Sequence, residues 1–210
     1  MTFNIIKTGS KGNAVILGGI ILIDCGVPYK DLANAIEDVN IVLLTHIHGD
    51  HFKKSTIRRL ARGRPTLRFA CCEWLVKPLL EAEVIAENID VLEIGKKYDY
   101  GLFQISPVLL YHNVPNCGYR VFFNSEKVFY ATDTTTLKGI EARDYDLYLV
   151  EANYDEEEIA ERIAKKEADG IYPYEYEVLK NHLSKKDCND FVYSNMGPHS
   201  KFVYLHEHKE

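Results

Sequence analysis

Residues 41–51 read I-V-L-L-T-H-I-H-G-D-H, a short apolar run followed at once by three histidines and an aspartate. The apolar run predicts a buried strand over residues 41–45, with the polar residues in the loop that follows it. His46 and His48 are two residues apart, so their side chains point to the same side of an extended segment. This stretch is therefore the first candidate for a functional site.

A turn at Gly49 is expected to separate this first pair of histidines from Asp50 and His51. Four ligands aimed at two neighbouring points predict two metal ions, because one structural zinc ion usually has a closed tetrahedral site with thiolates. The alternative is a surface loop that is rich in histidine by chance.

Further candidate ligands follow other predicted strands. They are His112 after 105–111, Asp133 after 128–132 and His206 after 202–205. An aspartate at such a position can bridge two cations through its two oxygens. His182, His199 and His208 compete for the same roles.

The composition indicates an ordinary globular protein. The chain has 210 residues, a net charge of −6, and five cysteines without C-x-x-C spacing. That length suits one domain over residues 1–210, and the cysteines suit reduced thiols. The sequence lacks signal-peptide features and a run long enough to cross a bilayer, so we expect a cytoplasmic protein without membrane contact.

The pattern of elements is strand-rich with helices in both halves. Strands are predicted at 2–8, 14–17, 20–24, 41–45, 66–71, 91–94, 97–100, 102–111, 118–123, 128–132, 146–151 and 201–206, and helices at 29–38, 54–63, 73–83, 155–168 and 184–194. Gly18-Gly19 is expected to form a hairpin turn, and Asp155 to cap the helix that follows it. Two packed sheets with helices outside are the expected α+β architecture.

The metal motif and its partners resemble the metallo-β-lactamase superfamily. The motif H-x-H-x-D-H after an apolar strand carries this resemblance, with a His, an Asp and a late His at later strand ends. The stretches T-G-S-K-G-N-A at 8–14, L-V-E-A-N-Y-D at 149–155 and N-H-L-S at 181–184 are similar to its YycJ/WalJ-like DNA exonuclease branch. The resemblance implies a four-layer αββα sandwich with the site at one edge of the sheets.

The resemblance also implies a role for each candidate residue. His46, His48 and His112 would hold one metal, Asp50, His51 and His206 the other, Asp133 would bridge them, and Asp24 would steady a ligand by hydrogen bonding. Glu151 would orient His182, which would give a proton to the leaving oxygen. The alternative is that His182 caps the helix predicted to begin at 184.

The chemistry expected of such a site is metal-dependent hydrolysis. Two divalent cations, whether zinc, manganese or iron, would lie about 3.5–4 Å apart and generate a bound hydroxide that attacks a phosphodiester. Asp50 would belong to the catalytic machinery as a ligand. The oligomeric state is not indicated by the sequence.

A basic run lies two residues beyond the metal motif. It reads K-K-S-T-I-R-R-L-A-R-G-R-P-T-L-R at 53–68 and holds no acidic residue. We expect Ile57 and Leu60 to face the core, while the basic side chains bind the phosphates of nucleic acid, most simply DNA. The predicted phosphate-binding residues are Lys53, Lys54, Arg58, Arg59 and Arg62. A solvated helix face is the alternative.

The leading prediction is thus a dinuclear metal-dependent nuclease, specifically a DNA exonuclease. A small-molecule hydrolase of the thioesterase or lactonase kind is the first alternative, because the same metal pair serves those reactions. A binding protein with a structural or degenerate metal site is the second.

Overall fold

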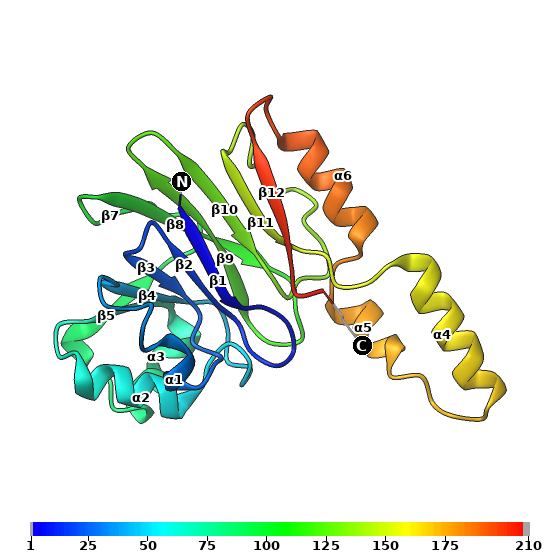
Figure 1. The fold of residues 1–210 in the computed structure, drawn as a ribbon, viewed down its shortest axis with the longest axis horizontal. Coiled ribbons are helices and arrows are strands. Elements are labelled where there is room, and N and C mark those ends of the chain that lie inside the picture. Colours follow the sequence, from blue (N-terminus) through cyan, green and yellow to red (C-terminus); the bar gives the residue numbers. More distant parts are fainter. Residues whose placement is uncertain (1, 208–210) are drawn as a thin grey trace. The chain divides into compact units, whose positions relative to one another are not determined.

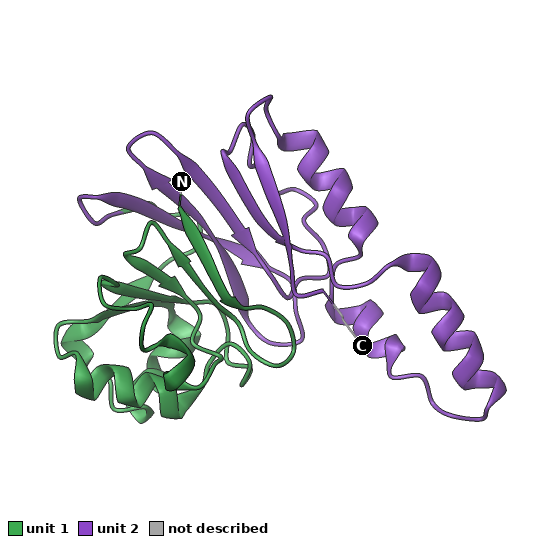
Figure 2. Cartoon of the chain, in the orientation of Figure 1, with its two compact units in different colours: residues 1–98 green, residues 99–210 purple. Residues whose placement is uncertain are grey.

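The computed structural model describes residues 2–207, which form two compact units that divide between Tyr98 and Asp99 (Figure 2). Each unit contains a six-stranded sheet with helices (Figure 1). The prediction of a single domain over residues 1–210 stays a prediction. Among the described residues, no helix has the length and apolar character needed to cross a bilayer.

The first unit contains one mixed sheet. Its elements are β1 (Phe3–Lys7), β2 (Ala14–Leu17), β3 (Ile21–Ile23), α1 (Tyr29–Leu32), β4 (Ile41–Leu44), α2 (Lys54–Gly63), β5 (Arg68–Cys72), the 3-10 helix η1 (Glu73–Leu75), α3 (Val76–Glu81), the 3-10 helix η2 (Ala86–Asn88) and β6 (Ile89–Leu92). The strands lie in sequence order, β1-β2-β3-β4-β5-β6. The pairs β1–β2 and β2–β3 are antiparallel, and β3 to β6 run parallel, so the carboxyl ends of β3 and β4 meet at one edge.

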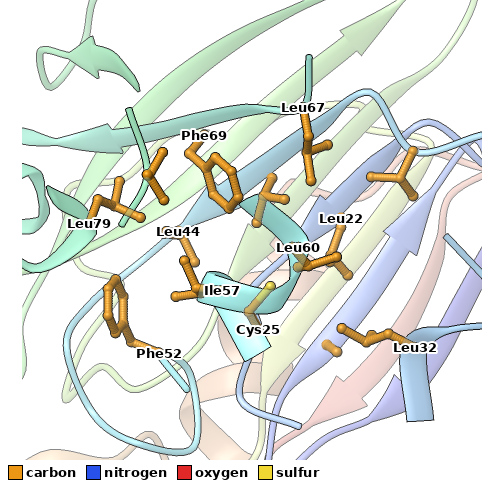
Figure 3. Close-up of a cluster of buried hydrophobic side chains, with 14 of the residues drawn as sticks. Leu22, Cys25, Leu32, Leu44, Phe52, Ile57, Leu60, Leu67, Phe69 and Leu79 are labelled. Atoms are coloured by element: carbon orange, nitrogen blue, oxygen red, sulfur yellow. The ribbon is translucent and has the colours of Figure 1, made fainter. Parts of the chain in front are cut away.

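Helix α2 covers one face of this sheet through its apolar side. Ile57 and Leu60 point from the helix toward Leu44 and Phe69, and all four are buried (Figure 3). The helix thus follows the predicted amphipathic pattern, with its basic residues on the opposite side. Because α2 begins shortly after the loop at 45–51, this packing anchors the loop's far end.

The second unit contains the other sheet, β12-β11-β10-β9-β8-β7. Its elements are β7 (Tyr98–Asp99), where the chain passes from the first unit, β8 (Phe103–Leu110), β9 (Asn116–Phe123), β10 (Lys127–Ala131), β11 (Leu147–Glu151), α4 (Glu156–Ala168), α5 (Glu175–Asn181), α6 (Lys185–Asn195) and β12 (Lys201–Leu205). Strand β9 is antiparallel to both β8 and β10, whereas β10, β11 and β12 are parallel. Strands β8, β10, β11 and β12 therefore all end at the same edge.

The second core lies under α6. Phe191 and Val192 of this helix pack against Phe129 and Tyr148 of the sheet. Helix α4 begins at the predicted cap, because the Asp155 side chain accepts a hydrogen bond from the backbone N–H of Glu157 at 3.0 Å. The cap confirms the helix start that the sequence predicted.

Most predicted elements are present, and the differences have local causes. The helix predicted over 29–38 ends at Leu32, and the chain continues in turns that still bury Ile36 and Val39, so their helix-like spacing was misleading. The helix predicted over 73–83 is divided into η1 and α3. Helix α5 was missed because seven residues are too short to show a clear period.

The five cysteines are all buried and free, as predicted for reduced thiols. Burial raises the pKa of the Cys71 thiol to about 12, with smaller contributions from Cys72 and Asp90, so it stays protonated and unreactive at neutral pH. The cysteines therefore act as small apolar core residues.

Candidate metal centre

In the first unit, the candidate ligands lie in the loop that follows β4. The ring centroids of His46 and His48 are 4.8 Å apart, and those of His46 and His51 are 4.2 Å apart. His46 and His51 are fully buried, whereas Asp50 is partly exposed. The loop therefore gathers its imidazoles into one cluster, and the predicted division of its ligands between two metal ions stays a prediction.

Asp24 organises this cluster from the end of β3. Its carboxylate accepts hydrogen bonds from the Thr45 backbone N–H at 3.0 Å and from the His51 Nδ1–H at 2.6 Å. The Thr45 hydroxyl lies 3.0 Å from both Asp24 oxygens and from His46 Nδ1. Because that hydroxyl has one proton and must give it to the carboxylate, His46 Nδ1 donates to the hydroxyl.

The consequence is a defined tautomer for two histidines. Both His46 and His51 carry their proton on Nδ1, so Nε2 has the lone pair that a metal requires. A carboxylate or hydroxyl behind a ligating histidine is the usual support of a metal site. Asp24 thus hydrogen-bonds a candidate ligand, as the resemblance implied, and its role at a metal site stays a prediction.

Two residues that support the loop were not predicted. A Cβ on Gly26 would lie 1.6 Å from the Asp50 carbonyl oxygen, so only glycine permits this approach. Asn13 donates its backbone N–H to the same oxygen at 2.6 Å, and its side-chain Nδ2 lies 2.7 Å from His51 Nε2. Asn13 lies in the T-G-S-K-G-N-A stretch and Gly26 follows Asp24-Cys25, so the sequence offered a signal for both.

The expected need for glycine at position 49 is not supported. A Cβ there would meet no atom within 4 Å, and Gly49 does not adopt a positive φ. The loop turns without using the conformational freedom of glycine, because its hydrogen bonds to segment 24–26, such as Cys25 N–H to His51 O at 2.8 Å, hold it in place.

In the second unit, the candidate residues lie at the shared edge of four strands. They are His112 after β8, Asp133 after β10, Glu151 at the end of β11 and His206 after β12. One ligand atom each from Asp133, Glu151, His206 and the nearby His182 lie within 4.8 Å of one another. The strand order of this sheet thus collects residues that are far apart in sequence.

His182 and Glu151 form the contact that the resemblance implied. His182 Nδ1 lies 2.6 Å from Glu151 Oε1 and 3.3 Å from Asp133 Oδ1. The other Glu151 oxygen accepts the backbone N–H groups of Thr134 at 2.9 Å and Leu183 at 3.3 Å. Glu151 is fully buried and held at both oxygens, so it can fix the orientation of the His182 ring.

The two carboxylates determine the charge of His182. Burial by itself would lower its pKa, but hydrogen bonds to Asp133 and Glu151 raise the pKa to about 10. The imidazole is therefore protonated at neutral pH in the metal-free protein. Positive charge near Asp133 would lower this pKa toward neutrality, where a histidine serves best as a general acid.

His112 also has the tautomer suited to a metal. Its Nδ1 lies 2.9 Å from the backbone carbonyl oxygen of Asn181, which only accepts, so Nδ1 carries the proton and Nε2 the lone pair. Of the competing candidates, His199 is exposed in a turn after α6, and His208 lies outside the described residues.

Backbone conformation marks three of these residues. Asp24, Asp133 and His206 have φ values of 62°, 53° and 53°, in the left-handed region that favours glycine. Asp24 and His206 follow directly after a strand, Asp133 lies two residues beyond one, and each aims its side chain at the candidate site. Such conformations are uncommon and cluster at functional sites.

The basic run on α2 is largely paired with acidic residues outside the run. Arg58 and Arg62 bind Glu83 at 2.9 Å and 2.5 Å, and Lys54 binds Glu81 at 3.2 Å. The Arg59 guanidinium lies 4.2 Å from the centre of the Tyr29 ring. Phosphate binding by Lys53, Lys54, Arg58, Arg59 and Arg62 stays a prediction, and these exposed ion pairs would compete with it.

Comparisons with known proteins give consistent results. A family model described as the β-lactamase superfamily domain matches residues 20–172. The exodeoxyribonuclease WalJ of Streptococcus pneumoniae is 24% identical over 229 aligned residues, covering 97% of this chain and 80% of WalJ. The anti-Pycsar protein Apyc1 of a Paenibacillus species is 28% identical over 150 aligned residues, 60% of each chain.

Solved structures agree at the level of the fold. The metallo-β-lactamase fold protein YhfI from Bacillus subtilis has a TM-score of 0.75 at 16% identity, covering 99% of this chain and 87% of YhfI. The short form of human tRNase Z has a TM-score of 0.72 at 15% identity, covering 100% of this chain and 93% of that protein. These likenesses confirm the predicted α+β fold.

Proposed function

The chain belongs to the metallo-β-lactamase superfamily, and from this premise we propose that it is a metal-dependent phosphodiesterase acting on nucleic acid, specifically a DNA exonuclease. Membership makes it a metal-dependent hydrolase. The substrate and the roles of individual residues are our proposal.

We propose that the candidate ligands hold two divalent ions. His46, His48 and His112 would bind one ion, Asp50, His51 and His206 the other, and Asp133 would bridge them. Imidazole and carboxylate ligands suit zinc, manganese or iron. Two such cations would lower the pKa of a water molecule and offset negative charge on phosphoryl oxygens.

The observation that carries this proposal is the hydrogen-bonding partner of Nδ1 in three histidines, from which their tautomer follows. His46, His51 and His112 each donate from Nδ1 to an acceptor of the protein, at 3.0, 2.6 and 2.9 Å. Each therefore has its lone pair on Nε2, as neutral metal ligands do. Histidines gathered only for packing would not need the same tautomer at three positions.

His182 supplies the proton that a leaving alkoxide needs. Its Nδ1–H is held by Glu151, so in the protonated ring Nε2–H is the proton available to the departing oxygen. Because hydrogen bonds from Thr134 and Leu183 hold Glu151, the ring cannot turn away from that direction. Phosphodiester cleavage, which expels a poor leaving group, gains most from such a donor.

The choice of nucleic acid as substrate is supported by the similar proteins. WalJ, which aligns with 97% of this chain, is named an exodeoxyribonuclease, and the short form of human tRNase Z has a name that denotes an RNA-cleaving enzyme. We propose DNA because the sequence similarity to WalJ extends over nearly the whole chain.

The test is metal reconstitution with competing substrates. Metal-stripped protein receives Mn²⁺ or Zn²⁺ and is offered linear duplex DNA, single-stranded DNA, RNA and a thioester. We expect metal-dependent release of nucleotides from DNA ends, no activity in Asp133→Asn, and a rate that falls steeply as salt rises.

A different outcome identifies the alternative. Hydrolysis of the thioester that is insensitive to salt, with DNA left intact, would identify a small-molecule hydrolase. Faster cleavage of RNA than of DNA would retain the phosphodiesterase and reject the DNA assignment.

A further inference from the structure

We infer that Asn153 is a positioning residue that holds His206 in the tautomer unsuited to metal binding, so that His206 can bind a metal only after its proton moves from Nε2 to Nδ1. Both residues are buried, with 6% and 4% of their surfaces exposed. The part of the inference that concerns metal binding rests on the proposed function. The part that concerns the tautomer of His206 in the metal-free protein does not.

The orientation of the Asn153 amide follows from a backbone group. One atom of this amide lies 2.9 Å from the His206 carbonyl oxygen and also 2.9 Å from His206 Nδ1. A carbonyl oxygen can only accept, so the amide atom beside it is the nitrogen Nδ2. With two protons, Nδ2 can donate to the carbonyl and to the ring at the same time.

The tautomer of His206 follows from the amide. Because Nδ1 accepts a hydrogen bond from Asn153, it carries no proton, and neutral His206 has its proton on Nε2. In that assignment a proton donor, rather than a lone pair, faces Asp133 Oδ1, which lies 3.3 Å from Nε2. Glu151 Oε1 lies 3.6 Å from Nδ1, too far to hold a proton there, and His182 occupies it at 2.6 Å.

His206 thus differs from three of the other candidate histidines. His46, His51 and His112 face acceptors at Nδ1, whereas His206 faces a donor at Nδ1. To offer a lone pair at Nε2, His206 must lose the proton from Nε2 and gain one at Nδ1, with no net change in protons. The Asn153 amide must then rotate, so that Oδ1 accepts the new Nδ1–H and the bond to the His206 carbonyl is lost.

This rearrangement makes the two metals unequal. The proposed ligands His46 and His112 are already in the required tautomer, but the ion bound by His206 must also drive the change at Asn153. We therefore expect two binding steps, with the weaker step at the His206 position. Losing one amide hydrogen bond weakens that step by about tenfold.

The tautomer is measured directly in metal-free protein. Long-range ¹H–¹⁵N spectra of the full chain labelled at histidine, with the His206 signals assigned from His206→Gln, distinguish the two protonated nitrogens. We expect Nε2–H in the wild type and Nδ1–H in Asn153→Asp, because a carboxylate accepts a proton there. A wild-type spectrum with Nδ1–H overturns the inference, whatever the enzymatic activity.

Metal titration by calorimetry tests the consequence. We expect Asn153→Asp to strengthen the weaker step about tenfold. Asn153→Ala removes the donor without adding charge, and it should strengthen the same step. Asn195→Asp is the matched control, because Asn195 is another asparagine of the second unit whose amide bonds to the backbone, at Phe191 O and Ala142 N, and these bonds involve no histidine. It should leave both steps unchanged.

The remaining outcomes also decide the question. Weaker binding in both Asn153 variants, with Asn195→Asp unchanged, would mean that Asn153 supports the metal, which overturns the inference. Wild-type protein with the expected Nε2–H tautomer but no metal binding would refute the proposed function and leave the assignment of the Asn153 hydrogen bond intact.

Discussion

The two groups of candidate ligands are built by different physical means. In the first unit, four candidates lie within residues 46–51 and are held by one buried carboxylate, Asp24, and by backbone contacts with segment 24–26. In the second unit, each candidate follows a different strand, and the sheet order brings them together. A contiguous motif depends on what supports its loop, whereas a strand-edge site depends on correct sheet topology.

The two groups also share a backbone conformation. Asp24 in the first unit and Asp133 and His206 in the second all adopt positive φ within two residues of a strand end. This conformation turns the side chain out of the strand direction at a cost of about 1–3 kcal/mol. Substitution of any of these three residues should therefore affect function more than the lost core packing would suggest.

Removal of a loop ligand should give the largest effect. Asp50→Ala is expected to lower kcat at least about a thousandfold. The substitution removes a ligand of the metal ion whose positive charge would offset the developing negative charge. The Asp50 side chain is 24% exposed, so the fold should persist. Asp38→Ala, at an exposed position of the same unit, is the control. Near-full activity of Asp50→Ala at saturating metal would refute the proposed site.

The candidate residues at the strand edge of the second unit are tested by substituting His182, the proposed proton donor. His182→Gln should lower kcat about a hundredfold or more with little change in KM, because general acid catalysis is lost. A general acid must be protonated, so wild-type kcat should fall as pH rises past its pKa, and this alkaline limb should vanish in the variant. Glu151→Gln should retain the limb at a shifted pH, since it changes the neighbouring charge.

If His182 is only a helix cap, the result differs. The helix at 184, α6, is capped by Ser184, whereas His182 occupies the C-cap of α5, where its backbone N–H bonds to Val178 O at 3.0 Å in any case. His182→Gln would then keep both its rate and its pH profile, and would change only the thermal midpoint.

Two glycines test the support of the loop in the first unit. Gly26→Ala places a Cβ 1.6 Å from the Asp50 carbonyl oxygen, so segment 24–26 must move away from the loop at 45–51. We expect a loss of about 3 kcal/mol or more in the free energy of unfolding and weaker metal binding. Gly49→Ala, where no atom lies within 4 Å, should be nearly neutral. Denaturant unfolding and metal titration compare them, and equal effects would contradict the assignment.

The sequence was most informative where a signal is local. The spacing of residues 46–51 identified the metal motif, and the apolar period of 54–63 identified α2 with its observed bounds. The strand-end positions of His112, Asp133 and His206 could be read because an apolar run precedes each. Their convergence within the second unit depends on β9 being antiparallel to its neighbours, which the sequence indicated only through a hairpin.

Other features could not be read because they depend on contacts distant in sequence. The approach of Gly26 to Asp50, and the amide of Asn153 against His206, need coordinates to be seen. The basic run appeared unopposed because its acidic partners, Glu81 and Glu83, lie beyond α2 and β5. Its pairing is the clearest case in which a one-signed stretch of sequence does not make a one-signed surface.

The smallest expected effect concerns this basic helix. Glu83 binds both Arg58 and Arg62, and the three side chains are 43%, 38% and 68% exposed. Exposed ion pairs contribute at most about 1 kcal/mol, so Glu83→Gln should barely change stability. If the arginines bind phosphates, releasing them should lower KM for DNA a few-fold at low salt.

The opposite change sharpens the same comparison. Arg58→Gln should raise KM for DNA and lower the slope of log KM against log salt concentration by about one, because one phosphate contact is lost. The two substitutions change the charge in opposite directions at a single ion pair, so a general loss of packing would move KM the same way in both. Only phosphate binding by α2 predicts opposite shifts, and unchanged KM and salt dependence in both variants would leave α2 as a solvated helix face.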